Sequence, residues 1–261
     1  MKTSFPTFLS ALCGLLLLIA VSAAAADIAV GTVTIDDETL KKAIIQVIQD
    51  DPKMVYDAYM AYQRQLAQQR DEQQLEYSFR NPATVPVRKD NPVMGPDNAP
   101  ITIACFMDFQ CPYCARSVST MTDLMKMYPG KIKLVYKNNP LPNHTAAIDA
   151  AKAALAAGKQ GKYWEFRDRL FADMSRLNDA GYVRLAGELG LDLAKFNADR
   201  KSEAVAATIA ADQKEAAGLS LRSVPYFYVN GIPVKGAKSV DYFKMVIDRL
   251  LAANAPGAAK K

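Results

Sequence analysis

The stretch that decides the fold is ITIACFMDFQCPYC, residues 101–114. Its first nine residues, Ile101 to Phe109, are mostly apolar and partly β-branched, which predicts a buried strand. The strand leads directly into a Cys-x-x-Cys motif, Cys111 to Cys114, and apolar side chains recur at helical spacing from there to Met127. The sequence therefore predicts a strand, two cysteines and a helix in immediate succession.

This order places the first sulfur at the N-terminus of a helix. Free backbone N–H groups and about half a positive charge stabilise an anion there, so we expect the Cys111 thiol to ionise easily. A thiolate is both the nucleophile and a good leaving group in disulfide exchange. Cys114, one turn into the helix, is expected to be shielded and to resolve the mixed disulfide. Pro112 suits a first helical turn because it needs no N–H partner there.

Two other interpretations of the cysteines are less favourable. A structural disulfide between residues only three apart would constrain the unfolded chain little. A zinc site would call for a second Cys-x-x-Cys motif, and recruiting Cys105 and His144 gives no familiar spacing. We therefore predict a redox-active pair, no metal site, and no cofactor beyond the Cys111–Cys114 disulfide itself.

Composition and charge narrow the class of protein. Half of the residues are apolar and 23% are charged, which is typical of a globular chain and not of a disordered, collagen-like or disulfide-scaffold protein. The net charge of +5 is spread along the chain without a Lys/Arg block or a stripe interleaved with aromatic residues. Nucleic-acid binding is therefore not expected.

Residues 1–26 resemble a secretory signal peptide. Lys2 precedes an apolar run from Phe8 to Val21, and Ala24 to Ala26 offers a small-residue cleavage site. We expect export to the periplasm or another oxidising compartment, where disulfides persist. The alternative is an uncleaved membrane anchor, which the shortness of the run and the lack of a following basic cluster disfavour.

Residues 27–80 are predicted to be helical. Asp51-Pro52 separates two helices, because Pro favours the first position of a helix and the residue before it leaves helical geometry. Apolar residues of the first helix fall on one face: Leu40, Ile44, Val47 and Ile48. The second helix is polar on every face from Gln68 to Gln74. These helices either pack on the main domain or pair with copies of themselves in a homo-oligomer.

The remaining segments complete the order of elements. Residues 81–99 are Pro-rich and predict a linker or an extended lead-in to the domain. A second strand follows at Ile132–Tyr136, and residues 143–217 are Ala-rich and helical in pattern, interrupted by glycines. Tyr226–Val229 and Ile232–Val234 flank Asn230-Gly231, which predicts a hairpin. An amphipathic helix ends the domain, and the tail at 255–261 is expected to fray.

Four segments in this order resemble the DsbA-like thiol-disulfide oxidoreductases: Phe106–Cys114, Pro140–His144, Gly161–Glu165 and Ser223–Gly231. The resemblance covers roughly residues 86–253. It implies an α/β thioredoxin fold formed by residues 100–142 and 218–254, with an inserted α-helical domain at 143–217 and an N-terminal helical extension before it.

The resemblance also implies roles for two residues far from the cysteines. In that family the proline that matches Pro225 is cis and faces the sulfurs, and the backbone of the residue that matches Val224 holds the substrate peptide. A cis X-Pro bond marks a deliberate turn and exposes backbone groups to an extended chain. Oxidase-type members often carry Val at this position, whereas isomerase-type members often carry Thr.

The N-terminal helices are similar in arrangement to those of suppressor-of-copper-sensitivity proteins of the C type, some of which oligomerise and act as isomerases. Cys105 stands where many DsbA-like relatives carry a buried acid, and we expect it to be a small buried hydrophobe. Strand alternation would turn Asp108 to the opposite face, so it is not favoured as a substitute. His144 is interpreted as a structural residue at a helix start, and Tyr163 and Trp164 as core aromatics.

The sequence thus predicts an exported enzyme that forms disulfides in cysteine-containing exported proteins. Cys111 and Cys114 would be catalytic, Pro112 and Tyr113 would complete the active-site motif, and a membrane redox partner would restore the disulfide. One alternative is an oligomeric isomerase or reductase kept reduced by a membrane partner. Another is a module whose cysteines bind a soft ion such as Cu(I).

Overall fold

The computed structural model describes residues 36–253, so the predicted signal peptide and the C-terminal tail lie outside the described residues. The chain divides into two compact units, one extending to Tyr62 and the other beginning at Gln63. Each unit is described by itself.

The first unit contains α1 (Asp37–Asp50) and the beginning of α2 (Pro52–Arg80). The Asp36 side chain caps α1 by accepting a hydrogen bond from the Thr39 backbone N–H at 2.9 Å. No residue of α1 is buried, and its apolar residues Leu40, Ile44, Val47 and Ile48 are all exposed. The predicted pair of helices and the break at residues 51–52 are confirmed.

The second unit is built on a five-stranded sheet of order β1-β3-β2-β4-β5. β2 and β3 are parallel, and every other neighbouring pair is antiparallel. The strands are β1 (Val93–Met94), β2 (Ile101–Met107), β3 (Ile132–Asn138), β4 (Tyr226–Val229) and β5 (Ile232–Lys235). The central place of β2 explains why its sequence is apolar almost throughout, since both of its faces are covered.

Alternate residues of β2 contribute to two separate cores. Ile103 and Cys105 point into the main core, which includes residues of α3 (Pro112–Met127) and α9 (Val240–Ala253). Ala104 and Phe106 belong to a smaller cluster with Ala216 of α8 (Glu203–Gly218). Because alternate side chains pack on both faces of β2, the end of this strand and the start of α3 are held in a fixed position.

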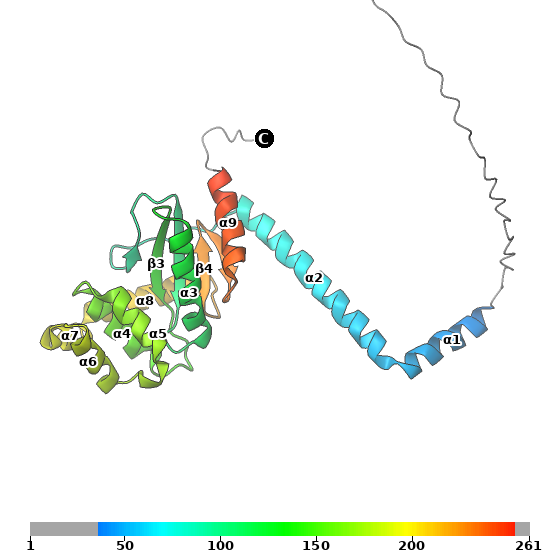
Figure 1. Ribbon diagram of the computed structural model, residues 1–261, viewed down its shortest axis with the longest axis horizontal. Coiled ribbons are helices and arrows are strands. Elements are labelled where there is room, and N and C mark those ends of the chain that lie inside the picture. The colour runs from blue at the N-terminus through cyan, green and yellow to red at the C-terminus, as the bar shows by residue number, and fades with distance from the viewer. Residues whose placement is uncertain (1–35, 254–261) are drawn as a thin grey trace, which may run out of the picture. The chain divides into compact units, whose positions relative to one another are not determined.

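Helices α4 to α8 lie between residues 147 and 218, and the sequence predicts an inserted helical domain at residues 143–217. They are α4 (Ala147–Gly158), α5 (Tyr163–Ala172), α6 (Asp179–Glu188), α7 (Leu193–Asp199) and α8, with a short 3₁₀ turn at Met174–Arg176. In Figure 1, α4 to α7 gather on one side of the sheet. Most of α4 is buried, and its alanines are small enough to let α5 and α8 pack closely against it.

The stretch 81–99, predicted as a linker or an extended lead-in, makes backbone contacts with the second unit. β1 lies within it and pairs with β3, and the Ala83 backbone N–H donates to the Gly231 carbonyl at 2.9 Å. The end of α2 belongs to the same unit, since Leu75 and Phe79 pack on the main core. Proline content predicts an extended backbone, but it does not reveal whether that backbone finds partners.

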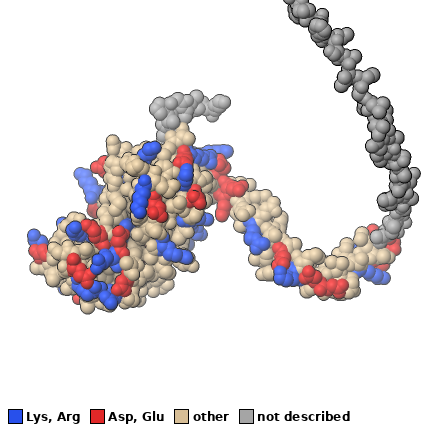
Figure 2. Space-filling model, viewed as in Figure 1, with Lys and Arg blue, Asp and Glu red and all other residues tan. Residues whose placement is uncertain are grey.

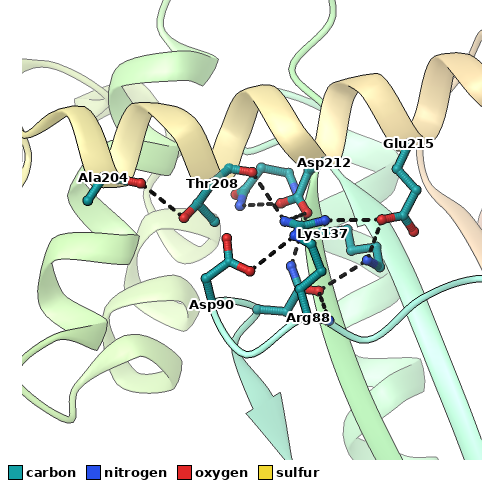
Figure 3. A network of polar contacts seen from close by, with 9 residues as sticks. Arg88, Asp90, Lys137, Ala204, Thr208, Asp212 and Glu215 are labelled. Carbon is teal, nitrogen blue, oxygen red and sulfur yellow. Dashed lines mark hydrogen bonds and ion pairs between the residues drawn. The ribbon is translucent and has the colours of Figure 1, made fainter.

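A network of buried charges joins this stretch to β3 and α8 (Figure 3). Lys137 is fully buried, and its Nζ lies 2.8 Å from Glu215 Oε2 and 3.1 Å from Asn91 Oδ1. Arg88 Nη2 donates to Asp212 Oδ1 at 2.6 Å. Because a buried ion without a partner is costly, these contacts fix the three segments relative to one another.

The face of the molecule in view in Figure 2 shows no segregation of charge. Lys and Arg are interspersed with Asp and Glu over the face in view in Figure 2. Within residues 36–253, no helix combines the length and apolar character needed to cross a bilayer.

Candidate functional site: a dithiol at the start of α3

The two cysteines of the motif lie where β2 gives way to α3. Cys111 is the N-cap residue of α3, with an extended backbone at φ −87° and ψ 117°, and Pro112 occupies the first turn. The N–H groups of Cys114 and Ala115 both donate to the Cys111 carbonyl, at 3.0 and 3.1 Å. The predicted succession of strand, cysteine pair and helix is confirmed, and it places the Cys111 sulfur at the positive end of the helix.

The environment of Cys111 favours its thiolate. Its pKa is lowered to about 6, chiefly by a hydrogen bond with the Cys114 side chain and further by the backbone N–H groups of Cys114 and Tyr113. Burial and the charge of Asp108 act in the opposite direction and are outweighed. Cys111 is only 5% exposed, so this thiolate is recessed below the surface.

The environment of Cys114 favours its thiol. The side chain is fully buried, and burial together with the neighbouring Cys111 raises its pKa far above that of a free thiol. The Cys114 Sγ accepts a hydrogen bond from the Asp108 backbone N–H at 3.4 Å. Two sulfurs one helical turn apart thus differ in both access and acidity, as nucleophilic and resolving cysteines do.

A turn before β4 faces the cysteines. The Val224–Pro225 peptide bond is cis, as the family resemblance implies. The Val224 carbonyl lies 3.6 Å from Cys111 Sγ, and the Pro225 carbonyl accepts a hydrogen bond from the Gly236 N–H at 3.0 Å. Residues 113 positions apart in sequence therefore meet at the sulfur that is expected to react.

Tyr113 is the exposed member of the motif. Its side chain is 55% exposed, and the Arg116 guanidinium lies 4.3 Å from the centre of its ring. This cation–π contact holds an aromatic surface beside the sulfurs.

The third cysteine lies apart from this pair. Cys105 sits inside β2 between β3 and β4, opposite Tyr136 and Phe227, and it is 2% exposed. Burial raises its pKa, so the thiol stays neutral. The predicted small buried hydrophobe is confirmed. Tyr163 is likewise buried, and the Trp164 indole N–H donates to the Val93 carbonyl at 3.3 Å.

Asp108, for which strand alternation predicted a position on the face opposite Cys105, lies just beyond the end of its strand. Strand alternation does not reach this residue, because β2 ends at Met107. The Asp108 carboxylate is buried, and it accepts hydrogen bonds from the backbone N–H of Gln110 at 2.7 Å and of Leu141 at 2.8 Å. Its negative charge raises the pKa of both motif cysteines, so it acts on both sulfurs.

His144 also differs from its prediction as the start of a helix. α4 begins later, at Ala147, and the His144 N–H closes a turn onto the Leu141 carbonyl at 3.0 Å. The ring Nδ1 lies 2.7 Å from Asp108 Oδ2. No local sequence pattern predicts the contact between Asp108 and His144. It depends on where β2 ends and on how the segment Pro140-Leu141-Pro142 brings His144 back toward Asp108. No cluster of three or more potential metal-ligating side chains occurs within residues 36–253.

A strand that leads into two unequal cysteines at a helix N-terminus, faced by a cis-proline, defines the class of thioredoxin-fold thiol-disulfide oxidoreductases. A family model described as Thioredoxin matches residues 88–249, more than half of the chain. The chain belongs to the thioredoxin family.

Solved structures support this placement. A thioredoxin-like oxidoreductase from Silicibacter pomeroyi DSS-3 is 31% identical, with a TM-score of 0.59 over 65% of this chain and 95% of the other. The thiol-disulfide exchange protein α-DsbA2 of Wolbachia pipientis shares the fold at 22% identity and a TM-score of 0.57, over 62% of this chain and 88% of its own. A linker-deletion variant of Proteus mirabilis ScsC shares it at 16% identity and a TM-score of 0.55, over 85% and 99%. The predicted fold and family are confirmed.

Curated relatives match over part of this chain only. The Na⁺/H⁺ antiporter NhaA 3 of Salinispora tropica is 38% identical over 149 residues, which make up 56% of this chain and 23% of the antiporter. This chain therefore spans about a quarter of the length of the curated relatives it matches, and their antiporter name belongs to those longer proteins.

Proposed function

We propose that this chain is an exported thiol-disulfide oxidoreductase that forms disulfides in cysteine-containing exported proteins, with Cys111 and Cys114 as its catalytic residues. The observation that carries this proposal is the contrast between the two sulfurs. The pKa of Cys111 is lowered to about 6, whereas that of the buried Cys114 is raised. A stabilised Cys111 thiolate favours the reduced form of the enzyme, which makes its disulfide a strong oxidant.

The reaction follows from this contrast. A substrate thiolate attacks Cys111 Sγ, the Cys111–Cys114 bond breaks, and Cys114 leaves and takes up a proton. A second substrate thiolate then attacks the substrate sulfur of the mixed disulfide and releases Cys111 as a thiolate. The substrate loses two electrons and gains a disulfide, and the enzyme gains two electrons as a dithiol. A membrane redox partner would then take up these electrons and restore the enzyme disulfide.

The substrate chain would bind across the turn at Val224 and Pro225. The Val224 carbonyl faces Cys111 Sγ, so a substrate segment in extended conformation can pair with this backbone while its cysteine meets the sulfur. The exposed ring of Tyr113, two residues along the motif from Cys111, offers an apolar contact. Export is proposed from the signal-peptide pattern of residues 1–26, because a protein disulfide persists in an oxidising compartment.

The test is the reduction potential of the Cys111–Cys114 pair, measured by equilibrating the protein in glutathione buffers. We expect a value near −120 mV, that of a strong oxidant. A value near −270 mV, as for thioredoxin, would contradict oxidation as the direction of the reaction. Cys114→Ser is expected to accumulate a mixed disulfide with a reduced substrate, and Cys111→Ser to form none.

A second candidate function is that of an oligomeric isomerase or reductase. The observation in its favour is the exposed apolar face of α1, formed by Leu40, Ile44, Val47 and Ile48. A second copy of the chain would cover this face, and paired redox sites would suit the reshuffling of incorrect disulfides. A low reduction potential combined with self-association would favour this candidate over the oxidase.

A further inference from the structure

Every thiol-disulfide exchange at this site moves a proton as well as electrons, and the proton of Cys114 needs a route. Cys114 is fully buried, so its sulfur does not meet bulk water directly. When Cys114 leaves the enzyme disulfide it must gain a proton, and before it attacks a mixed disulfide on Cys111 it must lose one. This requirement rests on the proposed function.

Apart from its reaction partner Cys111, the ionisable residue in contact with Cys114 is Asp108. Its backbone N–H donates to Cys114 Sγ at 3.4 Å, so the carboxylate is separated from the sulfur by the atoms of a single residue. The carboxylate itself is 0% exposed, and its oxygens are held by the backbone N–H groups of Gln110 and Leu141. The orientation of the carboxylate is therefore fixed.

His144 connects this buried carboxylate to the surface. Its Nδ1 lies 2.7 Å from Asp108 Oδ2, and the side chain is 20% exposed. A ring that contacts a buried acid and is also partly exposed to water suits a proton relay, since its two nitrogens can donate and accept protons.

The other ionisable groups nearby do not compete for this role. Tyr136 of β3 is affected by the charges of Cys114, Asp108, Tyr163 and Arg167, and burial raises its pKa well above the ordinary value. Burial also raises the pKa of Tyr163 in α5 well above its ordinary value. It raises the pKa of Cys105 in β2 as well, so this residue stays a neutral thiol.

We propose that Asp108 and His144 form the proton route of the resolving cysteine. When the enzyme disulfide is reduced, a proton passes from water through the His144 ring and the Asp108 carboxylate to the Cys114 thiolate. When the dithiol is oxidised, the Cys114 proton leaves along the same path as its sulfur bonds to Cys111 and expels the attached thiol as a thiolate. Asp108 and His144 end each cycle in their starting protonation states.

Reaction of the reduced full-length protein with the aromatic disulfide DTNB separates the two cysteines in time. Cys111 thiolate attacks first and releases one coloured thiolate in a phase whose rate depends on the reagent concentration. Cys114 then displaces the second coloured thiolate from Cys111, in a phase independent of that concentration. The first phase tests the proposed function, and the second tests the proton route.

We expect Asp108→Asn to slow the second phase at least about 10-fold at pH 7, because general acid–base groups contribute about 100-fold or more. The first phase should persist, and below pH 6 it should be faster, since the Asp108 charge raises the pKa of Cys111. His144→Ala should also slow the second phase, and added imidazole should restore it. Imidazole should not rescue Asp108→Asn, which lacks the carboxylate.

Asp248→Asn is the matched control. Like the Asp108 carboxylate, that of Asp248 connects separate parts of the chain, since Asp248 of α9 accepts a hydrogen bond from the Tyr128 hydroxyl at the end of α3. Its charge is not among the causes that shift the pKa of either motif cysteine. Both phases should keep their rates in this variant. A second phase that is unchanged in His144→Ala, or slowed but not restored by imidazole, would overturn the proposal. This arm does not depend on Asp108→Asn, so it decides the question even if that variant fails to fold.

Discussion

At the scale of single residues, the proposed function depends on the opposite pKa shifts of two cysteines that lie one helical turn apart. Cys111 receives hydrogen bonds at the N-terminus of α3, whereas Cys114 lies where water does not reach. The same thiol thus becomes a thiolate in one place and a neutral thiol in the other. The difference comes from position and not from residue type, which is why the spacing of the motif was so informative in the sequence.

The pH dependence of alkylation follows from this difference. Below its pKa of about 6 Cys111 is protonated and reacts slowly, and above it the thiolate reacts at a constant rate. We expect the rate of iodoacetamide labelling of the reduced protein to rise with a midpoint near pH 6 and to level off by about pH 7, one unit above that pKa. An ordinary cysteine would still be gaining rate at pH 8.

Mass spectrometry identifies the labelled residue in this experiment. Cys111→Ser serves as the control and should show almost no labelling, because Cys105 and Cys114 are buried with raised pKa values. Both should label once the protein is unfolded. A midpoint near pH 8.5, the value for a free cysteine, would contradict the proposed thiolate.

At the scale of elements, the hairpin between β4 and β5 fixes the cis-proline turn beside β2. Asn230 and Gly231 form its turn with φ values of 47° and 85°. The Asn230 side chain accepts a hydrogen bond from the Thr102 N–H at 2.6 Å and donates to the Pro100 carbonyl at 2.8 Å. The turn therefore closes the hairpin and also ties it to the start of β2.

Gly231→Ala should destabilise the protein. An added Cβ would lie 2.3 Å from the Ala83 carbonyl oxygen, and the positive φ is itself unfavourable for Ala. We expect the free energy of unfolding to fall by about 1–3 kcal/mol, measured by urea denaturation. Gly187→Ala in α6, where an added Cβ meets nothing within 4 Å, should raise it by about 0.5–1 kcal/mol. Equal effects of the two changes would contradict this account of the turn.

The buried network predicts a second stability difference. Lys137→Met removes a fully buried cation and leaves Glu215 with Arg88 alone, at 3.1 Å. We expect a loss of about 3 kcal/mol in the free energy of unfolding, since removing one partner of a buried ion pair leaves the remaining charge less well compensated. Lys159→Met breaks a surface pair with Asp199 and should cost under about 1 kcal/mol. If Lys137→Met lowered the free energy of unfolding by as little as Lys159→Met, the buried network would contribute little to stability.

Local patterns predicted most of the elements but not the long-range contacts. The strands, the helix after the cysteines and the hairpin follow from periodicity and turn residues close together in sequence. β1 has only two residues, and its existence depends on pairing with Val135 and Leu134, some 40 positions away. The contact between Asp108 and His144 similarly depends on the exact end of a strand, which periodicity does not locate.

At the scale of the whole molecule, the boundary between the two units lies inside α2 and not at its end. The second unit begins at Gln63, and Leu75 and Phe79 pack on its core. A continuous helical pattern does not show which of its turns contact a core, so residues 27–80 were predicted as a single region. Any truncation that removes the N-terminal unit should therefore stop at Tyr62.

Self-association through α1 can be tested without truncation. Ile44→Glu places a charge on the exposed apolar face, where Ile44 is 50% exposed. If a second copy covers this face, the variant should sediment as a monomer while the unmodified protein sediments as an oligomer. Gln46→Glu adds the same charge at a polar position of α1 and should leave the oligomer intact. An unmodified protein that is monomeric would remove the main support for the isomerase function.

The shallow recess that holds Cys111 also determines which proteins can react with it. A sulfur that is 5% exposed and faces the Val224 carbonyl at 3.6 Å cannot meet a cysteine that is fixed inside a finished globule. It can meet one on a segment that is still free to bend into the recess. Under the proposed function, newly exported chains would therefore be oxidised before they finish folding, and a substrate protein would escape further exchange by completing its own structure.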